Sequence, residues 1–296
     1  MNKVTSFAEV TRTYLNKPLT QDELFNENKI VDIKELTGFT PRRGLERGII
    51  CNDKLVNVVS NQYGHLPNEQ FFIEAERKLI DKDINYAIRS INRNDCSFVA
   101  DYILQDEKYH VNVKTGNDDI LTPMIRLVNS YDGSCKTMGF FGFYRQICMN
   151  GLNVGKLHLG FDIRHKGDIA QIVMPELDEL IEKFIVNEFY DLKRKFEVLA
   201  ETPITNLENF VQIMVKKTGL FKYEMSDKNP LPSLNARTVI ETITNEANLL
   251  NIEPNYWLGY NAMNEFLHGK LKKSFEKQRE LDSAIFETIY EAAMAN

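Results

Sequence analysis

A change of hydrophobic period near Pro175 is the feature that most constrains how this chain folds. Before it, residues 87–163 form short runs of alternating apolar and polar side chains, the pattern of antiparallel strands. The pairs Asp132-Gly133 and Asn150-Gly151 separate such runs, and these pairs close hairpins because glycine readily takes a positive φ. After Pro175, apolar residues recur with the period of amphipathic helices. The sequence therefore predicts an α+β protein, in which an antiparallel β-meander with a packed helix precedes a helical C-terminal region.

The same patterns predict three parts. Residues 1–45 are expected to form a helical or irregular leader, residues 46–170 an antiparallel β-rich α+β domain, and residues 171–296 a helical region packed on the same core. A helix with Asn68 as its N-cap is expected over 68–80. The expected C-terminal helices are at 177–200, 206–218, 234–250, 256–268 and 274–294, with a loop at 225–233.

Composition excludes several classes of protein. The chain has 296 residues, 43% of them apolar and 10% aromatic, which is too apolar for a disordered chain. Its net charge of −6 excludes a strongly basic coat for nucleic acid. No signal peptide or membrane-spanning run is apparent. The 4 cysteines form no CxxC pair, so we expect reduced thiols in a cytoplasmic protein.

The negative charge is not spread evenly, because residues 123–167 hold six Lys or Arg against two Asp or Glu. This stretch is also rich in Phe and Tyr. Cations that neutralise phosphates and aromatic rings that stack on bases are what a single-stranded nucleic-acid groove requires. The other interpretation is that the aromatic side chains are core and the cations an ordinary solvated strand face. The candidate nucleic-acid-binding residues are Arg126, Lys136, Arg145, Lys156, Arg164, Tyr131 and Tyr144.

The densest unusual segment runs from Asn129 to Leu152 and reads NSYDGS, then GFFGFYRQICMNGL. It resembles a large family of unknown function, found among phage- and plasmid-like proteins, that shares an NSYDGS turn followed by an FR.VC.NG strand and turn. The segment NYWLGYNA at 255–262 is similar to the W..YNA segment of that family. The resemblance covers roughly residues 45–290, and Arg145 is retained although the residues ahead of it depart from the pattern.

The resemblance implies a phage or mobile-element origin and no established activity. The order of helix, antiparallel meander and helices is also loosely similar to phage single-strand annealing proteins. From the residues themselves, Asn129 and Asp132 are expected to hydrogen-bond amides of a tight turn, and Asp132 to pair with Arg145. The motif residues expected to have a structural role are Asn129, Asp132, Gly133, Cys148, Asn150 and Gly151.

Signals of enzymatic chemistry are few. His158, His165 and Asp162 form a possible metal cluster, but without HExxH or HxH spacing. Cys148 lies in an apolar run, which favours an inert thiol over a nucleophile. No P-loop or dinucleotide fingerprint occurs, so no cofactor is expected.

The leading hypothesis is a phage-type single-stranded DNA-binding or annealing protein that acts as a homo-oligomer in the host cytoplasm without a cofactor. One alternative is a phage protein that binds and redirects a host factor, and another is a metal-dependent enzyme on nucleic acid. The apolar stripe of residues 274–294 packs either within the chain or against further copies in an oligomer. No membrane partner is expected.

Overall fold

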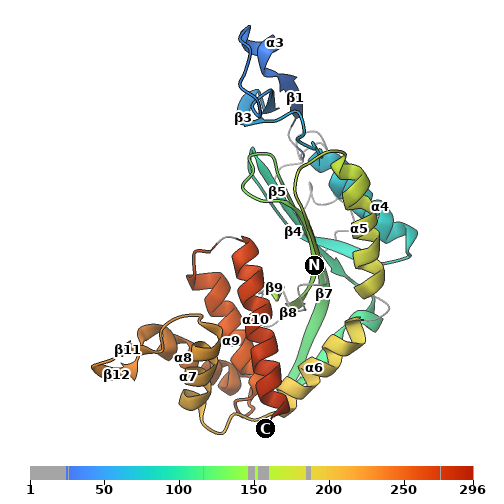
Figure 1. The fold of residues 1–296 in the computed structure, drawn as a ribbon. Coiled ribbons are helices and arrows are strands. Elements are labelled where there is room, and N and C mark those ends of the chain that lie inside the picture. Colours follow the sequence, from blue (N-terminus) through green and yellow to red (C-terminus); the bar gives the residue numbers. More distant parts are fainter. Residues whose placement is uncertain are drawn as a thin grey trace. The chain divides into compact units, whose positions relative to one another are not determined.

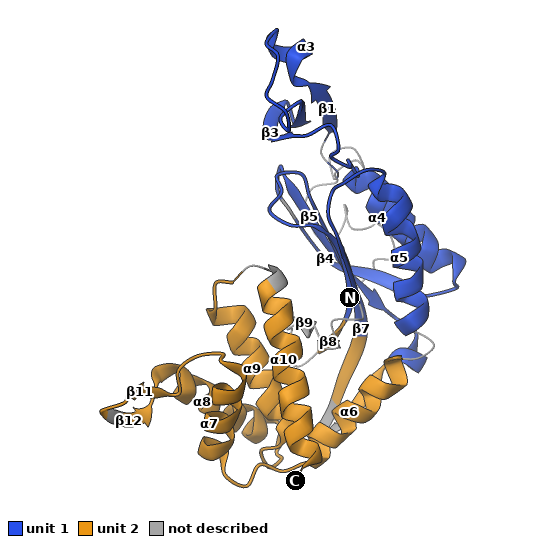
Figure 2. Cartoon of the chain, in the orientation of Figure 1, with its two compact units in different colours: residues 1–109, 123–141, 159–184 blue, residues 110–122, 142–158, 185–296 orange. Residues whose placement is uncertain are grey.

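The protein is described by a computed structural model that covers residues 25, 27–115, 117–145, 151–152, 160–184, 188–273 and 275–295. The chain divides into two compact units (Figures 1 and 2). Unit 1 contains residues 1–109, 123–141 and 159–184, and unit 2 contains residues 110–122, 142–158 and 185–296. Antiparallel sheets and a helical C-terminal region confirm the α+β class. The division differs from the expected boundaries at 45 and 170, since two long strands have residues in both units.

The main sheet has the strand order β10-β8-β7-β5-β4. Its strands are β4 (Tyr86–Arg93), β5 (Ser97–Leu104), β7 (Asn117–Ser130), β8 (Thr137–Arg145) and β10 (Gly160–Ile163). In unit 1, β5 pairs antiparallel with both β4 and β7, and β10 pairs antiparallel with the start of β8. In unit 2, β6 (Val111–Thr115) pairs with the start of β7, and β9 (Gly151–Leu152) with the end of β8. The predicted meander is thus present.

Two helices complete the core of unit 1. Helix α4 (Asn68–Asp81) buries the predicted stripe that contains Phe71 and Phe72. Its N-cap is Pro67, not Asn68, whose side chain is buried and hydrogen-bonded to Asn129 instead.

Helix α5 (Ile169–Lys183) begins before Pro175, which lies inside it. The side chain of Asp168 accepts a hydrogen bond from the Gln171 N–H and so caps the helix there. Residues 177–183 and 189–200 of the expected helix are helical, in α5 and in α6 (Phe189–Glu201), and residues 185–187 between them lie outside the described residues.

A three-stranded sheet precedes α4 and has the order β1-β2-β3. It consists of β1 (Asn28–Asp32), β2 (Arg47–Cys51) and β3 (Lys54–Val59), with the short helix α3 (Ile33–Thr37) between the first two strands. Asn52 and Asp53 join β2 to β3 with φ values of 47° and 59°, as a tight two-residue hairpin requires. Several apolar side chains of this region are exposed, and Phe39 is the most exposed at 79%.

Unit 2 contains the helical C-terminal part of the chain. Besides α6, its helices are α7 (Leu207–Thr218), α8 (Leu234–Leu250), α9 (Tyr256–Lys270) and α10 (Phe275–Met294). These bounds agree with the predicted helices to within two residues. Gly219 ends α7 with a φ of 65°, the left-handed C-cap conformation. The expected loop at 225–233 is instead a small hairpin of β11 (Glu224–Ser226) and β12 (Asn229–Pro232).

The apolar stripe of α10 is used within the chain. Ile285, Phe286 and Ile289 are 0% exposed, and α10 contacts α9, α7 and α6. These three side chains are therefore not available for self-association. Within the described ranges, no helix has the length and apolar character that crossing a membrane requires.

Candidate nucleic-acid interface

Arg145 is a buried residue of unit 2 and does not face solvent. Its side chain and that of Asp119 are both 0% exposed, and its Nε lies 2.8 Å from each oxygen of Asp119. Its Nη1 pairs with Glu246 of α8. The indole of Trp257 in α9 donates to Asp119 Oδ2 at 2.9 Å. The expectation that Arg145 contacts phosphate is wrong, because two carboxylates and the surrounding core enclose it.

Arg145 also does not pair with Asp132, as the sequence led us to expect. Arg145 pairs with Asp119 instead, because the fold of unit 2 brings Asp119 to the end of β8. Glu246 of α8 and Trp257 of α9 complete the same buried cluster.

Arg126 and Lys136, from unit 1, are each neutralised by a neighbouring strand. Arg126 in β7 lies opposite Asp101 in β5 and binds it with two contacts, at 2.5 Å and 2.7 Å. The Arg126 side chain is 20% exposed and that of Asp101 is 2% exposed. Lys136 Nζ lies 2.9 Å from Asp162 Oδ1. The sheet therefore pairs these cations with carboxylates instead of presenting them together to phosphates.

The aromatic side chains of this stretch are core. Tyr131 is 1% exposed, and its hydroxyl oxygen accepts a hydrogen bond of 2.6 Å from the Asn68 N–H. The proposed stacking role of Tyr131 is therefore wrong. Tyr144 is partly buried. The buried Phe residues of the stretch are Phe140, Phe141, Phe143 and Phe161.

The NSYDGS segment forms a turn and a buried anchor. Asp132 Oδ1 accepts a hydrogen bond from the Ser134 N–H at 2.9 Å, and Gly133 has a φ of 77°, as expected for this turn. Asn129 is 0% exposed and does not hydrogen-bond the turn; its Nδ2 donates to the Leu66 carbonyl at 2.9 Å. Its Oδ1 accepts from the Thr137 hydroxyl at 2.8 Å. The motif thus ties β7 to the chain before α4 and to β8.

Four predicted residues, Cys148, Asn150, Lys156 and His158, lie outside the described residues. Gly151 begins β9 opposite Tyr144. Among the described residues, no three His, Cys, Asp or Glu side chains gather as ligands for a metal ion. Of the proposed metal cluster, Asp162 pairs with Lys136, whereas His165 contacts Gly64 and Thr137.

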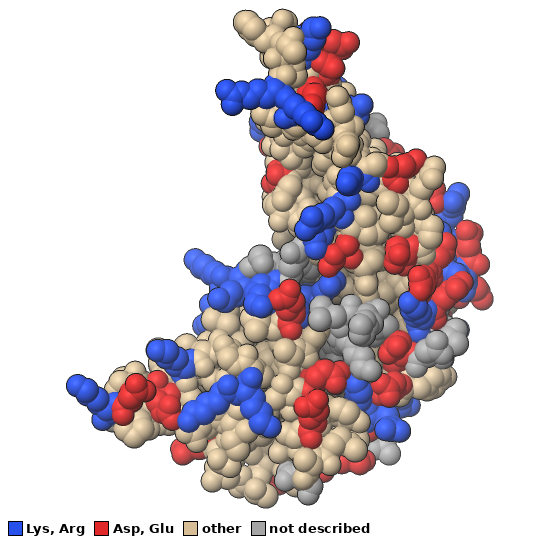
Figure 3. Space-filling view, viewed as in Figure 1, with Lys and Arg blue, Asp and Glu red and all other residues tan. Residues whose placement is uncertain are grey.

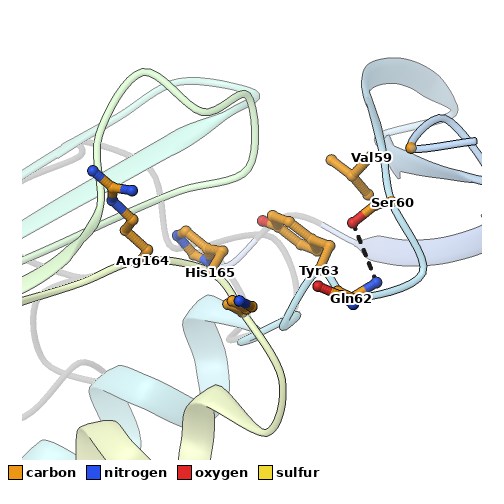
Figure 4. Close-up of a pocket in the computed structure, with 8 residues that line it drawn as sticks. Val59, Ser60, Gln62, Tyr63, Arg164 and His165 are labelled. Carbon is orange, nitrogen blue, oxygen red and sulfur yellow. Dashed lines mark hydrogen bonds between the residues drawn. The ribbon is translucent and has the colours of Figure 1, made fainter.

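Arg164 is the predicted cation that the structure leaves exposed beside a pocket. The pocket, of about 360 Å³, lies in unit 1 and is lined mainly by two chain segments, the one from the end of β3 onward and the one between β10 and α5 (Figure 4), with Gly44 from the chain before β2. Lys166 is also exposed, and within the described part of the chain neither cation has a carboxylate partner. The lining residues are Gly44, Val59, Ser60, Gln62, Tyr63, Arg164, His165 and Lys166.

Short contacts hold the two segments of this pocket together. The Gly167 N–H donates to the Gln62 carbonyl at 2.9 Å. A Cβ on Gly64 would lie 2.5 Å from the Gly167 carbonyl oxygen, so only glycine permits this approach. The rings of Tyr63 and His165 stack with centroids 5.2 Å apart and planes inclined by 8°. In Figure 4 the Arg164 guanidinium extends past His165, on the side away from Tyr63.

The fixed charge of the pocket comes from Arg164 and Lys166. Burial lowers the pKa of His165, although the Gly64 carbonyl opposes this effect. Burial also raises the pKa of the Tyr63 hydroxyl. Elsewhere on the face drawn in Figure 3, basic side chains stand in separate groups interspersed with acidic ones. Sequence reasoning missed Ser60, Gln62 and Tyr63, because the two segments lie about a hundred residues apart and neither carries a recognisable motif.

Acidification is expected to weaken the fold through His65. Burial, and secondarily the charge of His165, lower the pKa of His65 from 6.5 to about 4. As the pH falls through this window, the unfolded chain takes up a proton that the folded chain does not, so stability is lost. When the pH falls from 6.5 to about 4, the unfolding free energy of the parent chain should therefore drop by about 2 kcal/mol more than that of His65→Gln. This figure is reduced from the full pKa shift because the His65 side chain is partly exposed. Urea unfolding at a series of pH values measures this difference, and parallel curves for the two chains would contradict it.

Comparison with known proteins identifies a family for this chain but assigns it no activity. A search of curated proteins and a search of solved structures found no match. A family model described as a domain of unknown function (DUF932) matches residues 55–285. The matched range includes both the NSYDGS segment and the segment at 255–262 that suggested an uncharacterised family. The chain therefore belongs to this DUF932 family.

Proposed function

We propose that this chain binds single-stranded DNA, as a phage-type annealing protein without a cofactor, and that it makes contact at the Tyr63–His165 pocket. The observation that carries the proposal is the placement of Arg164 and Lys166, two exposed cations without carboxylate partners in the described chain, at the mouth of one pocket. Cations in this state are available to neutralise phosphates, whereas Arg126 and Lys136 are engaged by Asp101 and Asp162.

The proposed contact covers one pocket, whereas the sequence predicted a DNA-binding groove along residues 123–167 of the sheet. The Phe residues of the central strands are core, so bases have no exposed row of rings on which to stack there. Tyr63 is a partly exposed aromatic ring at the pocket, and a base would contact the part of the ring that His165 does not cover. Affinity should therefore come mainly from phosphate contacts and depend steeply on salt.

The double variant Arg164→Gln with Lys166→Gln tests the proposal directly. We expect it to bind a fluorescently labelled single-stranded oligonucleotide about tenfold more weakly at low salt. The slope of log affinity against log salt should fall by about 1.4, because two phosphate contacts are lost. Fluorescence anisotropy across a salt series measures both quantities.

The matched control is Lys54→Gln with Arg77→Gln. These cations also belong to unit 1 and their side chains are 70% and 65% exposed, but they pair with Asp95 and Glu74. The control removes the same charge and should retain most of the affinity. Equal weakening by both double variants would show that only bulk charge matters and would contradict the pocket.

Absence of oligonucleotide binding by the parent chain at low salt would overturn the DNA proposal. Binding to a host protein would then be the function to examine. The apolar side chains exposed near the first three strands suit such a partner, and they include Leu36, Phe39, Leu45 and Leu55.

A further inference from the structure

His165 makes two polar contacts that are both satisfied as hydrogen bonds only when both of its ring nitrogens carry hydrogen. Its Nδ1 lies 3.2 Å from the carbonyl oxygen of Gly64, and a carbonyl only accepts, so Nδ1 must be the donor there. Its Nε2 lies 3.3 Å from the hydroxyl oxygen of Thr137, which can in principle donate or accept.

The hydroxyl proton of Thr137 is already committed to another partner. Asn129 uses both hydrogens of its Nδ2, which donates to the Leu66 carbonyl at 2.9 Å and to Asn68 Oδ1 at 2.8 Å. The Leu66 carbonyl fixes which end of the Asn129 amide is nitrogen, and Asn129 Oδ1 then accepts from Thr137 at 2.8 Å. Toward His165, therefore, Thr137 has only lone pairs.

A neutral His165 satisfies one of its two contacts, and the imidazolium satisfies both. With hydrogen on Nδ1 alone, the Nε2 lone pair faces the lone pairs of Thr137. Opposing the second proton is burial of the ring, which lowers the pKa of His165. The polar network thus favours the charged ring, while burial disfavours it.

The charges that face His165 come from every neighbouring segment. Arg164 and Lys166 flank it in sequence, and His65 and Tyr63 lie on the segment after β3. The nearby carboxylates are engaged elsewhere, since Asp162 pairs with Lys136 of β8 and Asp168 caps α5. Beside the pocket, the Glu46 carboxylate accepts from the Gly44 and Asn61 N–H groups, and Asp132, whose charge acts on Tyr63, accepts from the Ser134 N–H. Within the described residues, none of these carboxylates pairs with Arg164 or Lys166, so both cations can contact a bound anion.

We propose that the pocket is an oxyanion site that binds its anion with His165 as the imidazolium, so that binding takes up one proton from solvent onto Nε2. Arg164 and Lys166 contact the anion, and His165 acts through its charge because both its nitrogens remain bonded to Gly64 and Thr137. No covalent bond is formed or broken. The inference rests on the proposed function where it takes the anion to be a phosphodiester of DNA. A free phosphate would present the same kind of anionic oxygen to the pocket.

The test follows the ring of His165 by NMR in the full chain labelled at histidine. The pKa of His165 is measured alone, with sodium sulfate as a free dianion, and with dimethyl phosphate as a diester. We expect the pKa of His165 to rise when the anion is bound. Because proton binding and anion binding are linked, the anion should then bind about tenfold more tightly when His165 is protonated than when it is neutral. His268 of unit 2, which contacts Asp282, should not respond to the anion and serves as the internal control.

Two variants keep the test decisive. Arg164→Gln with Lys166→Gln leaves the buried network untouched and should abolish the response of His165 to the anion. Thr137→Val removes the acceptor of Nε2 and should reduce the response; if it unfolds the chain, the first variant still decides. A rise with dimethyl phosphate supports the site and assigns it to the DNA backbone, and a rise with sulfate alone supports it as a site for free phosphate.

No change in the pKa of His165 with either anion would overturn the inference. Failure of the inference and failure of the proposed function can be told apart. If the oligonucleotide binds through Arg164 and Lys166 with an affinity that does not depend on pH, the function stands and proton uptake is refuted. If sulfate raises the pKa of His165 but no oligonucleotide binds, the oxyanion site stands and the DNA-binding function is refuted.

Discussion

Replacing Arg145 with methionine should lower the free energy of unfolding of unit 2 by about 3–5 kcal/mol, because the change leaves buried carboxylates without their counter-ion. Asp119 is 0% exposed and Glu246 is 8% exposed, so water cannot solvate either charge in place of the guanidinium. Burial raises the pKa of Glu246 even with Arg145 present, which shows that the site already disfavours its charge.

The single tryptophan of the chain makes this change measurable. Trp257 donates to Asp119, and its ring centroid lies 5.5 Å from Arg145 Cζ, so its fluorescence reports on unfolding of the cluster itself. Urea unfolding followed by this fluorescence should show an earlier midpoint for Arg145→Met.

The matched control adds Asp119→Asn to Arg145→Met. Asparagine removes one buried charge and retains an oxygen that accepts from the Trp257 indole, so the double variant should recover part of the lost stability. A loss below about 1 kcal/mol for Arg145→Met, typical of an exposed ion pair, would contradict the burial of this cluster.

Replacing Asn129 with leucine should cost unit 1 about 3 kcal/mol, because several buried polar groups lose their partner at once. The Leu66 carbonyl, the Asn68 side chain and the Thr137 hydroxyl all hydrogen-bond Asn129, and leucine has a similar size but can bond none of them. Thermal and urea unfolding followed by far-UV circular dichroism measure the loss.

Asp132→Ala provides the comparison, since Asp132 lies three residues further along the same NSYDGS segment. Its side chain is exposed and accepts one hydrogen bond within the turn, so its loss should cost only about 0.5–1 kcal/mol. Equal losses for the two variants would mean that the segment stabilises the chain through its turn and not through the Asn129 anchor.

The structure confirms those predictions that depend on side chains close together in the sequence. The helix over 234–250 has its predicted bounds, because its apolar period and the cap Ser233 lie within the segment itself. A prediction was wrong where a residue suited to a local hydrogen bond binds a residue far away in the sequence instead. Asn68 has the chemistry of an N-cap, yet Asn129, 61 residues away in sequence, takes its side chain into the core.

The candidate site was predicted in part, and mainly through Arg164. The sequence identified a basic, aromatic stretch at 123–167 and the family to which it belongs, which the family model matching residues 55–285 confirms. It did not indicate that Tyr63 and Gln62 would line one pocket with Arg164 and His165. That juxtaposition depends on a contact between residues 101 positions apart, the hydrogen bond from His165 to Gly64.

The sequence by itself determined the α+β class, the bounds of the last four long helices and the turn at Gly133, because side-chain period and turn chemistry act over a few neighbouring residues. Only the tertiary structure decided which of the predicted cations are neutralised by carboxylates. Whether an arginine is neutralised depends on a carboxylate that the fold brings to it, as Asp101 reaches Arg126 across 25 residues and Asp119 reaches Arg145 across 26. Arg164 and Lys166 remain exposed, without a carboxylate partner in the described chain, at a pocket that two distant segments build.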